Sequence, residues 1–194
     1  MVNSTKNFQT QKKLLKAILC LILLFQISNS WAQTKVYNAL HFDGVNDNAI
    51  TTTLNLDDTV VPVTTWEAWI LPTTNDGNYR MIMSVEDGGC DRFIAMNGGN
   101  FVVGIGTAIC LWSPAVIDLN QWQHIAVVYD EGAGVAKFYK NGVEYTSSLS
   151  GHSAAVKFGI GCSQQAGPTQ FYQGAIDEVR VWNVAEHNLK FRDR

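Results

Sequence analysis

The sequence predicts an all-β protein, built as a two-sheet antiparallel sandwich of the jelly-roll kind. Short runs rich in β-branched and aromatic residues recur along the chain, and Gly-rich turn signals separate them. No segment keeps a helical period of apolar residues over several turns. Only 16% of the residues are charged, and the six tryptophans suit a core enclosed between two layers.

Strands are expected wherever alternating or β-branched runs end at a turn signal. The run 121–129 (QWQHIAVVY) is the strongest, and Asn141-Gly142 between two runs is the preferred two-residue hairpin turn. The expected strands are 49–54, 64–71, 80–85, 92–96, 101–105, 121–129, 135–140, 143–147, 155–160 and 175–182.

The N-terminal residues 1–32 predict a cleaved secretory signal. Four lysines and no acidic residue precede an apolar run at 17–27. Ser30 and Ala32 then place small residues three and one positions before a cleavage point. A single membrane anchor is the alternative, but the run is shorter than the about 20 apolar residues that span a bilayer. The predicted localisation is therefore secreted or cell surface.

Cleavage after residue 32 would leave a chain of 162 residues (194 − 32), enough for one domain with a sizeable core. Four of the 14 basic residues and none of the 17 acidic ones are removed, so the net charge becomes −7 (10 − 17) instead of −3. An acidic chain argues against a nucleic-acid partner, because phosphates require a basic face.

Four motifs in sequence order resemble the laminin-G-like, concanavalin A-like jelly-roll domains of the lectin/glucanase superfamily. Trp66-Glu-Ala-Trp-Ile70 is similar to their E-x-W strand, and the run 122–130 (WQHIAVVYD) to their W-x-H strand. The run 137–142 (KFYKNG) and the run 176–183 (IDEVRVWN) resemble two later strands, and Phe42-Asp-Gly44 stands in front. The resemblance predicts one domain over 33–185, whose first and last strands pair, and a short tail, 186–194, that departs from the family's helical ending.

A structural calcium ion is what this resemblance implies near the paired end strands. The implied ligands are the Asp177 carboxylate, with Asp43 and the carbonyls around Gly44 as further donors, because calcium prefers hard oxygen ligands. Simple alternation places Asp177 on one strand face with Val179 and Val181, where a charge needs a partner. Asp177 as a hydrogen-bonded or ion-paired structural acid is the alternative.

Two loop aromatics are candidate ligand contacts, because sugars stack on exposed rings. Trp112 stands in Leu111-Trp-Ser-Pro114, which is interpreted as a loop, and Tyr79 follows Asn75-Asp-Gly-Asn78. Both could instead cap an end of the core.

An acidic cluster, Glu86, Asp87 and Asp91, is either a turn or a rim for a ligand. Cys90 and Cys110 flank the hairpin expected around 97–100, so a disulfide between them is a candidate. A two-residue loop would set Cys90 opposite Thr107, and the sequence leaves the pairing open.

The resulting interpretation is a secreted, non-catalytic recognition module that binds carbohydrate or another extracellular surface. An adhesive or spacer domain of a larger cell-surface protein is the second class. A glucanase-like hydrolase is the third, but no strand carries alternating carboxylates. Glu67 stands alone between two tryptophans, and His124 is interpreted as a structural histidine. The oligomeric state stays open.

Overall fold

The computed structural model describes residues 38–52, 54–85, 91–106, 110–148, 157–164 and 168–186. All of them belong to the compact unit Asn38–Arg194. The predicted signal peptide, 1–32, lies outside the described residues. Within these ranges the chain forms strands only, and no helix there is long and apolar enough to cross a membrane. The strands are β1 Leu40–Asp43, β2 Ala49–Thr51, β3 Val63–Pro72, β4 Arg80–Ser84, β5 Arg92–Asn97, β6 Asn100–Ile105, β7 Cys110–Val116, β8 Gln123–Asp130, β9 Val135–Lys140, β10 Val143–Ser148, β11 Phe158–Ile160 and β12 Gln173–Trp182.

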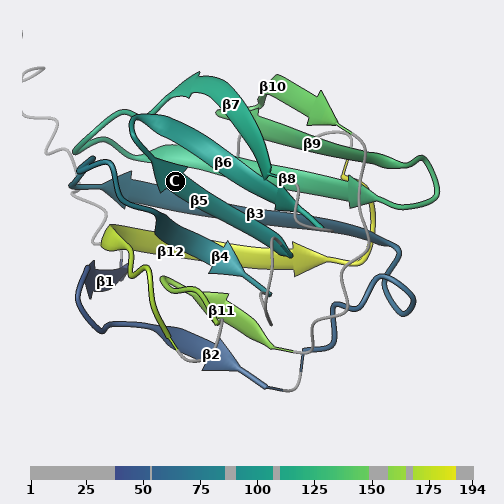
Figure 1. Cartoon of the computed structure of the whole chain (residues 1–194), viewed down its shortest axis with the longest axis horizontal. Helices are drawn as coiled ribbons and strands as arrows, with labels where there is room; N and C mark the ends of the chain where they lie inside the picture. Colours follow the sequence, from purple (N-terminus) through teal and green to yellow (C-terminus); the bar gives the residue numbers. More distant parts are fainter. Residues whose placement is uncertain are drawn as a thin grey trace, which may run out of the picture. The chain divides into compact units, whose positions relative to one another are not determined.

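Two antiparallel sheets of six strands each face one another, as Figure 1 shows. We call them sheet A, with strand order β1-β12-β3-β8-β9-β10, and sheet B, with order β2-β11-β4-β5-β6-β7. The predicted two-sheet sandwich is therefore confirmed. The expected pairing of the first and last strands is confirmed as well, because Leu40 of β1 lies opposite Ile176 of β12.

The core lies between the sheets and is centred on Trp66, which is fully buried. Its indole ring packs edge-on against Tyr129 of the same sheet and Phe158 of the other, at centroid distances of 5.2 and 5.3 Å. Burial of each large apolar side chain stabilises the fold by about 1.5–3 kcal/mol. This cluster therefore stabilises the packing of the two sheets against each other.

The two predicted hairpin turns form with the expected geometry. Asn141 and Gly142 both have positive φ (50° and 75°), as does each glycine of the Gly98-Gly99 turn (57° and 91°). Paired positive φ values match the right-handed twist of the flanking strands. The Gly98-Gly99 turn fixes the register of β5 with β6, whereas the register of β9 with β10 shifts once more between Glu144 and Thr146.

The expected faces of the last strand are wrong beyond Asp177, because the strand contains a bulge. The pairing with β3 shifts between Asp177 and Arg180, and Glu178 has a φ of 52°. The extra residue reverses the alternation. Ile176 is buried in the core and Val179 and Val181 pack against it, whereas Asp177 no longer shares their face.

Leu111–Pro114 is not the loop that the sequence predicted, but part of β7. Leu111 lies opposite Val103 and packs against the core, and Ser113 and Ala115 are buried, whereas Trp112, Pro114 and Val116 are exposed. Pro114 is tolerated because β7 is the edge strand of sheet B. β2 is also shorter than expected and ends at Thr51.

Candidate ligand-binding site

The outer face of sheet B, opposite the core, carries an apolar row that crosses four strands. Met81 of β4 lies opposite Ala95 of β5, Ala95 opposite Val102 of β6, and Val102 opposite Trp112 of β7. The alternation of strand residues turns this row away from the core. Met81, Ala95 and Val102 are nevertheless almost completely buried, and they form a second small apolar cluster with Phe93.

Tyr79 lies two residues before Met81, at the β4 end of this row, and Trp112 lies at the β7 end. Their rings nevertheless meet above the row. Their ring centroids are 6.4 Å apart and their planes differ by 65°. The small side chains of Ala95 and Val102 between them leave room for the long rings to lean together. Trp112 stays 50% exposed, and Tyr79 is half-buried against the cluster. We call these two residues the aromatic pair.

Amide side chains border the aromatic pair at the turn end of the sheet. Asn97 and Asn100 face each other across β5 and β6, and alternation places both on the outer face with Ala95 and Val102. Both are half-buried. The side-chain amide of Asn75, in the β3–β4 loop, lies against Gly99 of the turn. This combination of exposed ring and amides can hold a molecule that has both apolar C–H faces and hydroxyl groups.

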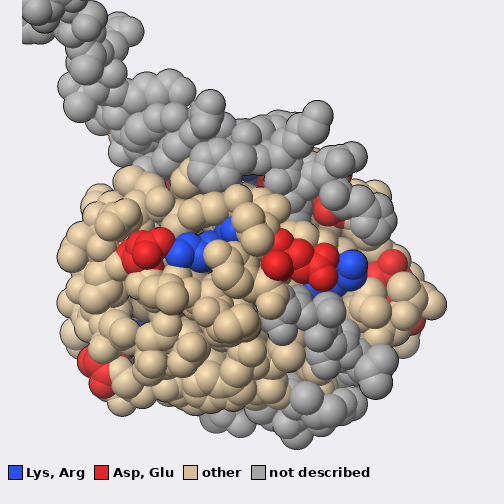
Figure 2. Space-filling model, turned by 90° about the horizontal axis from the view of Figure 1, so that it is seen from above, with Lys and Arg blue, Asp and Glu red and all other residues tan. Residues whose placement is uncertain are grey.

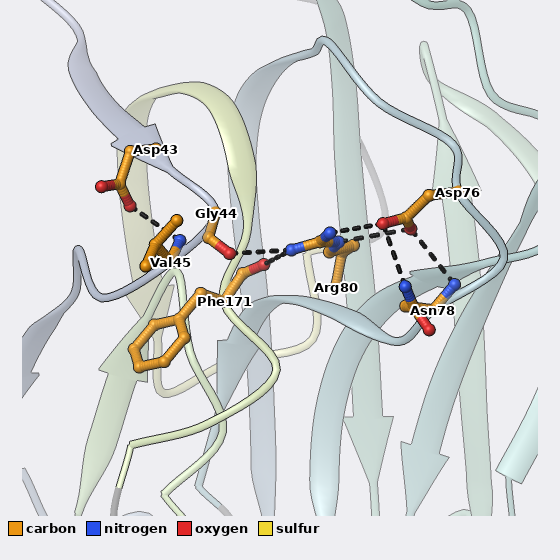
Figure 3. Close-up of polar contacts among 7 residues, drawn as sticks. All are labelled: Asp43, Gly44, Val45, Asp76, Asn78, Arg80 and Phe171. Carbon is orange, nitrogen blue, oxygen red and sulfur yellow. Dashed lines mark hydrogen bonds and ion pairs between the residues drawn. The ribbon is translucent and has the colours of Figure 1, made fainter.

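Arg80, the residue after Tyr79 in the chain, holds the loop before β4 in place, and Figure 3 shows its contacts. Its Nη1 donates hydrogen bonds to the carbonyl oxygens of Gly44 and Phe171, both at 2.9 Å. Its Nε and Nη2 bind the carboxylate of Asp76. Hydrogen bonds from Arg80 and then from Asn78 lower the pKa of Asp76 well below its ordinary value. One guanidinium thus joins three loops, which lie before β2, before β4 and before β12.

The three residues predicted as calcium ligands do not meet at one point. Asp43 lies opposite Gln173, whereas Leu40 lies opposite Ile176, so Asp43 and Asp177 are about 13 Å apart along the paired strands. The Asp177 carboxylate accepts a hydrogen bond from the backbone N–H of Glu178 at 2.8 Å. The carbonyl of Gly44 already accepts from the cationic Arg80.

Asp43 itself closes a local turn at the end of β1. Its Oδ1 accepts hydrogen bonds from the N–H groups of Val45 (2.7 Å) and Asn46 (3.2 Å), and these bonds lower the pKa of Asp43. Across the described ranges, no three His, Cys, Asp or Glu side chains gather as a metal site. Asp43, Gly44 and Asp177 therefore do not fit one calcium ion, and calcium binding stays a prediction.

Of the remaining candidates, Glu86, Asp87 and Cys90 lie outside the described residues. Asp91 is half-buried directly before β5, and Cys110 is half-buried at the start of β7, opposite Gly104. The Cys90–Cys110 disulfide and the acidic rim therefore remain predictions.

Glu67 anchors a polar cluster on the outer face of sheet A, a role that the sequence did not predict. Its carboxylate lies 3.2 Å from Nε2 of His124 and accepts a hydrogen bond from the indole N–H of Trp182 at 3.1 Å. Arg180 lies 3.5 Å away. Burial acts to raise the pKa of Glu67, but the hydrogen bonds from His124 and Trp182 and the nearby positive charges hold it below its ordinary value.

The register explains why sequence reasoning missed this cluster. Glu67 lies opposite Arg180, and Trp69 lies opposite both Asp177 and His124. The pairing of Glu67 with Arg180 depends on the bulge at Glu178, which the alternation rule does not predict, whereas the contact with His124 comes from the β3–β8 register. The cluster ties three strands of sheet A together and gives His124 the structural role that the sequence predicted for it.

Comparison with known proteins places the chain in one superfamily. A sequence model described as the concanavalin A-like lectin/glucanases superfamily matches residues 43–187. No curated protein matches the chain.

Similar solved structures share the fold at low identity. A candidate carbohydrate-binding protein from Bacteroides ovatus is 21% identical with a TM-score of 0.59; the match covers 76% of this chain and 44% of that protein. A heptameric SAP-like pentraxin from Limulus polyphemus is 19% identical with a TM-score of 0.58, and 75% of each chain is covered. The CBM40 module of a Ruminococcus gnavus sialidase is 11% identical with a TM-score of 0.54, with 76% of this chain and 91% of that module covered.

Proposed function

The chain belongs to the concanavalin A-like lectin/glucanases superfamily, and on that premise we propose that it is an exported, non-catalytic module that binds carbohydrate through the aromatic pair. Export is proposed from the N-terminal segment 1–32, and the ligand from the outer face of sheet B. The single observation that carries the binding proposal is Trp112, a large aromatic side chain left 50% exposed beside Tyr79.

The exposed indole of Trp112 offers a ligand a broad apolar face to cover. Leaving half of Trp112 in water forgoes much of the stabilisation that burial of its apolar surface would give. The sequence alternation of β7 buries Ser113 and Ala115 and turns the largest side chain outward. Sugars bury C–H faces on such rings, and their hydroxyls suit the amides of Asn97 and Asn100.

The similar structures support a carbohydrate as the class of ligand. One is a candidate carbohydrate-binding protein, one module was solved with α2,3 sialyllactose, and the cell entry of botulinum neurotoxin type C depends on interaction with two ganglioside molecules. A hydrolase is not supported by the residues, because the two adjacent acids of β12, Asp177 and Glu178, do not alternate on one face.

The test is a glycan array probed with the purified protein and with Trp112→Ala. We expect selective binding that Trp112→Ala weakens at least tenfold, which corresponds to a loss of about 1.4 kcal/mol of apolar contact with the indole. The matched control is Tyr145→Ala, which removes an exposed ring from β10 of the other sheet and leaves binding unchanged. If no glycan is bound but a protein partner is, the chain is an adhesive or spacer domain instead.

A further inference from the structure

Five of the six lysine and arginine side chains of the described residues are occupied by partners. Arg80 binds two carbonyl oxygens and Asp76, and Arg92 is fully buried between Glu131 and the ring of Tyr129. Lys137 pairs with Glu144, Lys140 with Asp118, and Arg180 with Glu67 and Glu178. On the face shown in Figure 2, basic side chains lie next to acidic ones.

Lys157 is the one described cation without such a pairing, and it lies far from the aromatic pair. It precedes β11, whose Gly159 lies opposite Ser84 at the end of β4, whereas Tyr79 precedes the start of β4. The strand rise separates the two positions by about 20 Å. Within the described ranges, no cation is therefore available to an anionic ligand at the aromatic pair.

An acidic sugar would be disfavoured at this site for two physical reasons. A carboxylate that loses water needs a hydrogen-bonded cation or several N–H donors. The faces of aromatic rings carry negative charge density, which attracts cations and repels anions. Asn97 and Asn100 offer amides, which donate to and accept from neutral hydroxyls equally well.

The angle between the two rings indicates how much of a ligand they contact. Planes that differ by 65° cannot both lie flat against the same sugar ring. When one sugar unit stacks flat on Trp112, the ring of Tyr79 is left for a neighbouring unit of the same glycan. The two ring centroids are only 6.4 Å apart, so adjoining units can reach both.

We propose that the aromatic pair binds a neutral glycan and contacts at least two adjoining sugar units, with Asn97 and Asn100 bonding its hydroxyls. This inference rests on the proposed function and names the ligand class of the same site.

The experiment compares matched neutral and acidic glycans on the full protein. Lactose, cellobiose and maltose are titrated beside galactose, glucose and α2,3 sialyllactose, with calorimetry and the tryptophan fluorescence that Trp112→Ala removes as readouts. We expect a neutral disaccharide to bind at least tenfold tighter than its monosaccharide and than its sialylated form. The affinity should be insensitive to salt, since no ion pair forms.

Asn97→Lys is the informative variant, because it places a cation beside the aromatic pair without removing a ring. We expect the ratio of affinities for sialyllactose and lactose to rise about tenfold, an effect that salt reduces. Asn55→Lys, an exposed asparagine before β3, is the matched control and should leave the ratio unchanged.

The possible outcomes separate the two proposals. Tighter binding of sialyllactose by the unaltered protein, weakened by salt, overturns the neutral class but leaves carbohydrate binding intact. Equal affinity for monosaccharide and disaccharide overturns the two-unit contact. If neither the panel nor the array gives binding, the proposed function fails together with this inference.

Discussion

At the scale of single residues, Glu67 shows how one carboxylate can hold three strands. Its partners come from β8 and β12, and its side chain is only 13% exposed. A hydrogen bond to a charged group contributes more than a neutral one, about 1.5–3 kcal/mol. The cluster is therefore a better source of stability than the exposed pairs around it.

The lowered pKa of Glu67 makes this stability depend on pH. A carboxyl whose pKa is lower in the folded than in the unfolded state contributes stability above its ordinary pKa of 4.5 and loses it as the pH falls further. We expect Glu67→Gln to cost about 1–2 kcal/mol at pH 7 and clearly less at pH 3.5. Urea unfolding at both pH values measures this.

Glu144→Gln is the control for that measurement. Glu144 pairs with Lys137 on β9, but its side chain is 42% exposed, so we expect a change below about 0.5 kcal/mol at either pH. A cost of Glu67→Gln that is equal at pH 7 and pH 3.5 would contradict the role assigned to the charge.

At the scale of elements, β12 is the strand that organises sheet A, because it pairs with β1 on one side and β3 on the other. Gly174 lies where the three strands meet, opposite Phe42 and Pro72. Its φ is 140°, and a Cβ there would stand 2.2 Å from the carbonyl oxygen of Leu71. Backbone geometry and space both exclude a side chain.

Gly174→Ala should therefore destabilise the protein by more than about 3 kcal/mol, since both strain and a backbone clash must be relieved. Gly77→Ala is the matched control: its φ is 80°, but nothing lies within 4 Å of the new methyl group. We expect that control to cost only about 1 kcal/mol. Chemical unfolding of both variants makes the comparison, and equal costs would show that space at Gly174 is not limiting.

Most strands were predictable from the sequence, but two of their details were not. The positive φ of Asn141 and Gly142 follows from residue type, so the β9–β10 hairpin was expected. The bulge at Glu178 leaves no signature in residue type, because Glu rarely adopts this φ. The contact of Glu67 with His124 was hidden for another reason, because it depends on the register between β3 and β8. Pro114 made β7 look like a loop, since a proline is compatible with a strand only at an edge, and edges are set by tertiary pairing.

At the scale of the whole molecule, one arginine joins the loops that precede β2, β4 and β12. The guanidinium of Arg80 neutralises Asp76 and binds the carbonyls of Gly44 and Phe171. The candidate site was partly predictable, because Tyr79 and Trp112 were named from the sequence. The 6.4 Å distance between their rings was not, because it depends on how β4, β5, β6 and β7 are aligned with one another.

Melting with added calcium and with excess chelator tests the calcium prediction: an ion that joins the ends of the chain should shift the melting temperature by at least the about 2–4 °C that 1 kcal/mol produces in a protein of this size, and a shift of no more than about 1 °C would overturn it. Arg80→Met should lower it by several degrees in either condition. A melting temperature that rises with calcium, and rises less in Asp177→Ala, would instead support the calcium ion that the resemblance implies.

Pro114 has a consequence for how the protein behaves at high concentration. Strand β7 runs along the border of sheet B, where a bare row of N–H and C=O groups would invite a strand from a second molecule and start aggregation. A proline interrupts that row, because it has no N–H to offer to an incoming chain. The protein can thus display the adjacent indole to its surroundings without making the same border a template for self-association.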